Sequence, residues 1–184
     1  AAIAVAIRWP KADWLTGLRV IAEDQQRAID LRMDALAALH AGAVPTETLE
    51  QLIEVYRDSV SPTESDRAAQ IIGNARLTLP QLELITSLME TASPGQLRDM
   101  IRPFQRQLPQ PVADQFLAAV GEAVALQSLP EHELSDVIKR FPKESILVGN
   151  KILDRLKKHQ QEKLARLEQL RSRLGDGDEN RGRV

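Results

Sequence analysis

The fold of this chain is decided by residues 49–64, which read LEQLIEVYRDSVSPTE. Apolar side chains recur there at i, i+3, i+4, i+7 and i+11, the spacing of one face of an α-helix, at Leu49, Leu52, Ile53, Tyr56 and Val60. The end of the stretch, Ser61-Pro62-Thr63-Glu64, combines an N-cap serine, a first-turn proline and a glutamate at capping-box spacing. The stretch therefore predicts one amphipathic helix and the start of the next.

The same alternation of stripes and helix starts continues along the chain. Further apolar stripes run through Ile29, Met33 and Leu36, through Leu84, Ile85 and Leu88, and through Val112, Phe116, Val120 and Val124. Helix starts are marked by Pro45-Thr46, Ser61-Pro62, Leu79-Pro80, Ser93-Pro94 (a second capping box with Gln96), Pro109 to Pro111, Leu129-Pro130 and Phe141-Pro142. These signals predict helices near 11–23, 25–41, 46–59, 62–74, 80–91, 94–107, 111–127, 131–140 and 143–174. Because aromatic residues make up only 3% of the chain and good helix formers dominate, the predicted class is all-α.

A weak internal repeat indicates how these helices are arranged. Aligning Pro45, Pro80 and Pro130 superimposes Leu49, Leu84 and Leu134, and then Ile53, Leu88 and Ile138. Short connections make neighbouring helices antiparallel hairpins, so the pattern predicts an irregular HEAT-like α-α superhelix with a long C-terminal helix. Chance alignment in a leucine-rich chain is the alternative. We expect residues 1–174 to form this helical domain and residues 175–184 to form a linker; the resemblance described below implies that it leads into a cytochrome c-like domain.

The last predicted helix differs from the others because it is locally basic and its leucine stripe is interrupted. His159, Gln160 and Gln161 occupy the turn where a buried side chain is expected. We therefore expect residues beyond about Gln160 to project from the helical body. An exposed apolar stripe on a charged helix is normally covered in the native assembly. The candidate partner-docking residues are the leucines of this stripe, Leu164, Leu167, Leu170 and Leu174.

Composition excludes several classes of function. The formal net charge is −2, and no aromatic residue is interleaved with the basic residues of the last helix, so we expect no nucleic-acid binding. The absence of cysteine excludes disulfides and thiol chemistry within the chain. The apolar opening at residues 1–7 is too short to span a bilayer, so we expect no membrane span in this segment. The start at Ala1 is typical of a segment of a longer protein.

No pattern in the sequence points to a catalytic, cofactor-binding or metal-binding residue. Glu131-His132-Glu133 resembles the start of a zinc-protease motif, but Asp136 stands where the second histidine is needed. The acidic turn at residues 176–180 lacks the glycine and glutamate that a calcium loop requires. Trp9 and Trp14 flank a predicted helix start and are interpreted as packing anchors, with a docking role as the alternative.

Two parts of the chain resemble a known family. The stretch from Asn74 to Leu82, with Arg102-Pro103-Phe104, is similar to the helical region of large planctomycete-type haem-binding dehydrogenase-like proteins. The tail from Leu174 to Val184 resembles the G-D-x-x-x-G-x-x-V-F start of their c-type cytochrome domain, although its turn is longer and the chain stops before any haem-attachment cysteine. The resemblance implies a helical stretch between a β-propeller and a cytochrome in an exported electron-transfer protein. It implies haem c for the parent protein and no cofactor in this chain.

Two functions follow as expectations. The first is a non-catalytic helical scaffold or spacer within a larger haem-binding protein, whose partners are adjoining domains of the same polypeptide. The second is a free-standing α-solenoid that binds a protein partner. An enzyme active site within these residues is not expected.

Overall fold

The computed structural model describes residues 12–24, 26–39 and 44–175, with the backbone alone described at residues 12, 13, 29, 30 and 172–175. Within these residues the chain forms helices and no strands, which confirms the all-α prediction. The α-helices are α2 (Ala12–Glu23), α3 (Ile29–Leu39), α4 (Thr46–Asp58), α5 (Pro62–Asn74), α6 (Leu79–Met89), α7 (Pro94–Met100), α8 (Gln110–Glu122), α9 (Glu131–Ile138) and α10 (Lys143–Gly175). Two 3-10 turns, η1 (Arg102–Phe104) and η2 (Leu126–Ser128), follow α7 and α8.

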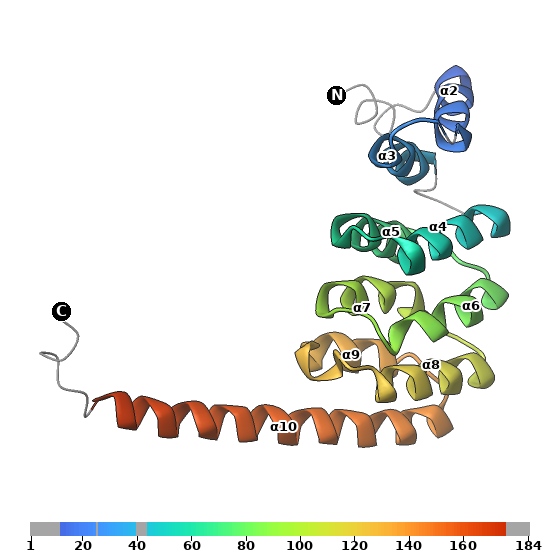
Figure 1. Cartoon of the computed structure of the whole chain (residues 1–184). Helices are drawn as coiled ribbons and strands as arrows, with labels where there is room; N and C mark the ends of the chain where they lie inside the picture. Colours follow the sequence, from blue (N-terminus) through green and yellow to red (C-terminus); the bar gives the residue numbers. More distant parts are fainter. Residues whose placement is uncertain (1–11, 25, 40–43, 176–184) are drawn as a thin grey trace, which may run out of the picture.

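The helices are stacked in layers of two (Figure 1). Successive layers hold α2 with α3, α4 with α5, α6 with α7, and α8 with α9, and α10 closes the stack. Contacts between layers run in two columns, from α4 to α6 to α8 on one side and from α3 to α5 to α7 on the other. The first half of α10 packs on α8 and α9, and its second half extends beyond the stack on the side of the second column.

Prolines and polar caps fix where the layers begin. Pro62, Pro80 and Pro94 occupy the first or second position of their helices, where their missing N–H leaves no internal hydrogen bond unmade. The capping box at Ser93 is confirmed, since the Ser93 backbone N–H donates to Gln96 Oε1 at 2.9 Å. The predicted capping box at Ser61 does not form.

At the start of α5 a different hydrogen bond replaces the expected box. The Ser61 side chain makes no cap hydrogen bond. The carboxylate of Glu64 accepts instead from Ser59 Oγ at 2.5 Å, and Ser59 Oγ also accepts from the Ser61 backbone N–H at 3.1 Å. The turn is thus closed by a serine two residues before the predicted cap.

The core is one continuous apolar cluster that runs through the stack. All three phenylalanines of the chain belong to it and contact one another in sequence. The ring centroids of Phe104 and Phe116 lie 4.5 Å apart, and those of Phe116 and Phe141 lie 5.5 Å apart at near right angles. Such tilted and edge-on geometries are favourable for aromatic pairs. The rings join η1, α8 and the link between α9 and α10.

Three predicted helices are too long. The 94–107 helix ends at Met100 because Pro103 lacks an N–H and restricts the residue before it, so the chain continues as the turn η1. The 111–127 helix ends at Glu122, and the N–H of Val124 donates to the carbonyl of Glu90 across the stack at 3.0 Å. The start of the 25–41 helix is replaced by a turn in which Asp24 accepts from the Gln26 N–H at 3.1 Å. Residues 40–43, at the predicted end of that helix, lie outside the described residues.

Early helix ends also expose residues that the stripes placed in the core. Val60 and Val124 follow α4 and α8, and their side chains are 99% and 83% exposed. Of the tryptophans, Trp9 lies outside the described residues and Trp14 is exposed, so the packing interpretation of Trp14 is wrong. The side chain of Ile29 is likewise outside the described residues.

The alignment of the repeat on prolines is wrong by two residues at one of its three positions. Pro80 is the second residue of α6, whereas Pro45 and Pro130 are the N-caps of α4 and α9. Leu84 is therefore exposed, and Leu82 occupies the fully buried place that corresponds to Leu49. Helices aligned on their N-caps, not on their prolines, present equivalent residues to the core.

Candidate partner-binding surface

Helix α10 changes its surroundings part-way along, as the interrupted stripe predicted. Ile152, Leu153 and Leu156 are buried against α8 and α9. The side-chain amide of Gln160 donates to the Leu129 carbonyl at 3.5 Å. All side chains of residues 161–171 are exposed, although the helix continues to Gly175. The predicted departure of the helix at about Gln160 is confirmed, and we call residues 161–175 the arm.

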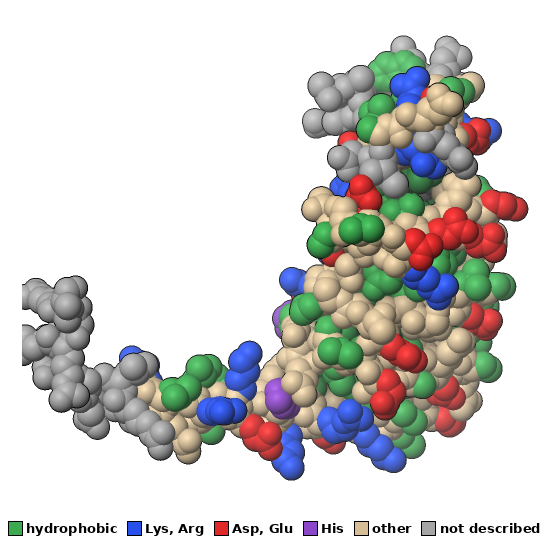
Figure 2. All heavy atoms as spheres, viewed as in Figure 1, with side chains coloured by type: hydrophobic (Ala, Val, Ile, Leu, Met, Phe, Trp, Pro, Cys, Tyr) green, Lys and Arg blue, Asp and Glu red, His purple; other side chains and the backbone are tan. Residues whose placement is uncertain are grey.

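The leucines proposed as docking residues lie along this arm. Leu164, Leu167 and Leu170 are 62%, 53% and 48% exposed, respectively. Leu174 belongs to the last turn of α10, and its side chain lies outside the described residues. In Figure 2 apolar and basic side chains stand next to one another on the arm. The arm therefore presents an apolar stripe that no described part of this chain buries.

Basic side chains share the face of these leucines. Lys163 and Arg171 stand four residues before and after Leu167, so helical geometry places all three on one face. Arg166 is one residue from Leu167 and borders that face. Glu168 borders the same face from the other side of Leu167, so three basic groups and one acidic group surround the stripe. A surface that covers the stripe therefore gains most if it combines apolar area with net negative charge.

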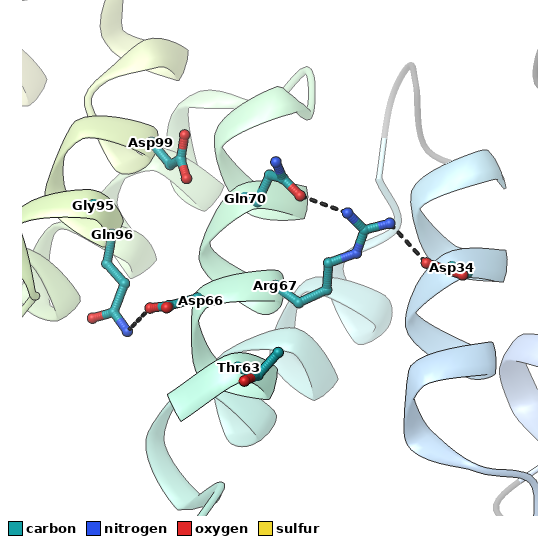
Figure 3. Close-up of a pocket in the computed structure, with 8 residues that line it drawn as sticks. All are labelled: Asp34, Thr63, Asp66, Arg67, Gln70, Gly95, Gln96 and Asp99. Atoms are coloured by element: carbon teal, nitrogen blue, oxygen red, sulfur yellow. Dashed lines mark hydrogen bonds and ion pairs between the residues drawn. The ribbon is translucent and has the colours of Figure 1, made fainter. Parts of the chain in front are cut away.

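A polar groove of about 570 Å³ crosses α3, α5 and α7 on the stack itself (Figure 3). Polar contacts cross it and link the helices that line it. Arg67 reaches from α5 to Asp34 on α3 at 2.7 Å and to Gln70 at 2.6 Å. From α7, Gln96 Nε2 donates to the Asp66 carboxylate at 2.8 Å. The groove thus joins three successive layers.

Tyr56 on α4 is buried and joins the hydrogen bonds of this groove through Gln96. Its hydroxyl lies 3.4 Å from the Leu88 carbonyl and 3.2 Å from Gln96 Oε1. Burial, with a smaller contribution from the negative charge of Asp66, raises the pKa of the Tyr56 hydroxyl. The phenol therefore stays neutral and can donate a hydrogen bond throughout the physiological pH range.

Ion pairs continue this pattern toward α10. Arg98 on α7 donates from Nε to Glu133 on α9 at 2.9 Å, and this hydrogen bond raises the pKa of Arg98. Lys157 on α10 pairs with Glu131 on α9 at 3.3 Å. Both pairs are solvent-accessible, so their contribution to stability is small. They link α7 to α9 and α9 to α10.

A second glutamine connects layers at the other column. Gln81 Oε1 accepts from the Thr78 N–H at 2.9 Å, and Gln81 Nε2 donates to the Val44 carbonyl at 2.8 Å. Gln81 is buried and closes the start of α6 while holding the start of α4. Gln81 and Gln96 each stand three residues after an N-cap and perform this double role, which the sequence signalled at Gln96 but not at Gln81.

The histidines do not form a site in the described residues. His40 lies outside them, His132 is exposed on α9, and His159 lies on α10. Asp136 pairs with Lys139 at 3.0 Å. Within the described chain no group of three or more His, Asp or Glu side chains could hold a metal ion. None of the described helices is long and apolar enough to cross a membrane.

The groove across α3, α5 and α7 was not predicted. Its partners stand 33 residues apart for Arg67 and Asp34, and 30 apart for Gln96 and Asp66. Polar residues that recur at a spacing of 30–33 residues, alongside the apolar repeat, are the signal that could have predicted the groove.

No protein-family model, curated protein or solved structure matches this chain.

Proposed function

We propose that this chain is a non-catalytic helical scaffold, an irregular HEAT-like α-α superhelix whose last helix projects as a rigid arm. The observation that carries the proposal is the change along α10 at Gln160. One half of this helix is buried in the stack, and the other is exposed with Leu164, Leu167 and Leu170 on its surface. Such a helix sets both the distance and the direction of whatever binds its outer half.

The construction of the stack favours a mechanical role. Glutamine hydrogen bonds, interlayer ion pairs and one continuous apolar core join the layers. A cooperative unit of this kind transmits position because its layers cannot slide independently. The polar groove across α3, α5 and α7 contributes to this rigidity, since Arg67 pairs with Asp34 on α3 and Asp66 accepts from Gln96 on α7.

The arm is a helix without tertiary packing, and its stability has a simple origin. An isolated helix of this length is marginal in water because nucleation is costly. Here the nucleus is supplied by the buried half of α10, so the arm extends a helix that already exists. We therefore expect the arm to fray from its C-terminal end, without a sharp break at Gln160.

We propose further that the parent protein is an exported, haem-binding electron-transfer protein of the planctomycete type, with haem c outside this chain. The resemblance of residues 74–82 and 102–104 supports this. These two stretches are neighbours in the fold, where Arg102 Nη1 donates to Asn74 Oδ1 at 3.2 Å and Arg106 Nη2 donates to the Leu77 carbonyl at 2.5 Å. If the encoding gene continues past Val184 without a Cys-x-x-Cys-His motif, the parent assignment fails and the scaffold proposal is unaffected.

Small-angle X-ray scattering of the dilute chain tests the scaffold. Ala165→Pro breaks α10 at an exposed position outside the stack, because proline removes a helix hydrogen bond and clashes with the preceding turn. We expect the wild type to scatter as a particle with the projecting arm of Figure 1. The variant should have a smaller maximum dimension, because its arm no longer projects, and an unchanged melting temperature. Ala165→Ser is the matched control. Equal scattering of all three proteins would contradict a rigid arm.

A free-standing interaction module is the second candidate, and the exposed leucine stripe is the observation that favours it. It predicts that a purified partner binds residues 1–184 directly and loses affinity on Leu167→Asp. Ala165→Asp adds the same charge on the arm, on the face opposite Leu167, and serves as the control. Equal binding by both variants would exclude the stripe as the docking face.

A further inference from the structure

A second groove lies at the opposite end of the stack from α10, between the α2–α3 hairpin and α4. Its volume is about 620 Å³, within the range of roughly 300–1,000 Å³ that is typical of binding sites. Leu15, Leu36 and Leu39 supply apolar surface, and Glu23 and Glu47 supply negative charge. We call it the α2–α4 groove.

The charge around this groove favours a basic occupant. Glu23 and Glu47 are both exposed at its edge, and Arg19 is the one base among the residues that line it. Beyond the groove, α4 exposes further carboxylates at Glu50 and Glu54. An apolar segment with basic flanks gains both burial and charge pairing at such a surface.

The arm of α10 has the complementary chemistry. It carries a row of half-exposed leucines with Lys163, Arg166 and Arg171 on or beside the same face. Within the described residues nothing covers its leucines and nothing fills the groove, and the two surfaces carry net charges of opposite sign. The α2–α4 groove and the arm lie at opposite ends of the stack, so the arm of one copy cannot reach the groove of the same copy (Figure 1).

Parallel pairing of two arms with each other is disfavoured by charge. A heptad register with Leu167 and Leu170 in the central seam places Arg166 and Arg171 at its flanking positions. In a parallel pair Arg166 then faces Arg171 of the second arm, and like charges oppose association. The groove of a second copy does not have this conflict.

We propose that the arm of one copy of this chain binds the α2–α4 groove of a second copy, head to tail. This inference rests on the proposed function, in which the arm projects from the scaffold, and it identifies a second copy of the chain as the partner of the arm. The two surfaces differ, so the contact is heterologous and leaves one free arm and one free groove at the ends of each assembly. Assemblies therefore grow with protein concentration, and salt weakens them because charges at the edge are screened.

Sedimentation velocity of the 184-residue chain over a range of concentrations tests this with matched charge reversals. Arg166→Glu with Arg171→Glu reverses the arm, and Glu23→Lys with Glu47→Lys reverses the groove. Each double variant is expected to weaken association by about tenfold or more. The control, Glu83→Lys with Glu122→Lys, makes the same charge change at exposed positions on α6 and α8 and is expected to associate like the wild type.

A mixture of the two reversed proteins provides the decisive comparison. The reversed arm of one and the reversed groove of the other are complementary again, so the mixture is expected to associate although each protein alone does not. A wild type that stays monomeric at every concentration overturns the proposal, as does an arm reversal that acts while the groove reversal does not. The scattering of the dilute wild type tests separately whether the arm projects. If the chain does not self-associate, the scaffold proposal is therefore unaffected.

Discussion

Gly73, near the end of α5, lies directly against the backbone of α7. A Cβ atom added at this position would stand 2.4 Å from the Asp99 carbonyl oxygen and 2.7 Å from its carbonyl carbon. Both are backbone atoms, so no rotation of a side chain relieves the contact. Gly73→Ala therefore tests whether α5 and α7 are packed as closely as the stack requires.

The magnitude follows from two opposing effects. Alanine favours a helix over glycine by about 1 kcal/mol at most. An ordinary contact between carbon and a carbonyl oxygen is roughly 3.3–3.6 Å, so α5 and α7 must separate by about 1 Å. Overpacking costs typically 1–3 kcal/mol, and a contact with backbone atoms belongs in the upper part of that range, at about 2–3 kcal/mol. We expect a net loss of about 1–2 kcal/mol, or a melting temperature lower by about 2–8 °C.

Urea and thermal unfolding followed by circular dichroism measure this loss. Gly17→Ala on α2 is the control, because Gly17 has nothing within 4 Å of the added Cβ. There the helix propensity acts alone and should raise stability by about 0.5–1 kcal/mol. If Gly73→Ala is as stable as the wild type or more stable, while Gly17→Ala behaves as expected, the close packing of α5 on α7 is refuted.

Three further predictions follow from named contacts. Because burial and the Asp66 charge raise the pKa of Tyr56 in the folded chain, the unfolded tyrosine releases its proton first, and the unfolding free energy should fall above about pH 10. Tyr56 is the only tyrosine, so its absorbance titration should have a midpoint above that of a free tyrosine, and Tyr56→Phe should remove its share of the alkaline loss. Gln96→Ala should cost about 1–3 kcal/mol in urea unfolding, since it removes a cap and its hydrogen bonds to α4 and α5; a loss below about 0.5 kcal/mol would contradict the network. In a dilute monomer, Leu156→Ala should lower the unfolding free energy by about 2–5 kcal/mol because Leu156 is buried, and Leu167→Ala by less than about 0.5 kcal/mol because Leu167 is exposed. Similar losses for both variants would show that the arm packs against the stack.

Helix starts and the departure of α10 could be predicted because both are local. A proline or capping serine fixes a start through its own backbone and side chain, and α4, α5, α7 and α9 begin where these residues stand. The arm was signalled by Gln160 and Gln161, polar residues in a turn where a packed helix needs an apolar one.

Helix ends and grooves could not be predicted because they depend on distant residues. The chain leaves α8 as Val124 bonds to the Glu90 carbonyl, a partner on another layer. The α2–α4 groove combines Leu15 and Leu36 with Glu47, which stand on three different helices. Neither the pairing nor the groove exists until the stack has formed, so no local pattern encodes it.

The claim that α10 continues as one helix beyond the stack is tested most directly by a distance within that helix. The chain has no cysteine, so spin labels can be attached at Leu147→Cys and Ala165→Cys, two exposed positions that lie on one face five turns apart. Pulsed electron paramagnetic resonance, with unlabelled chain in excess, is expected to give one narrow distribution near about 27 Å, from a rise of 1.5 Å per residue. A broad distribution, or one centred well below this distance, would show that the arm bends or unfolds after Gln160 and would contradict the account.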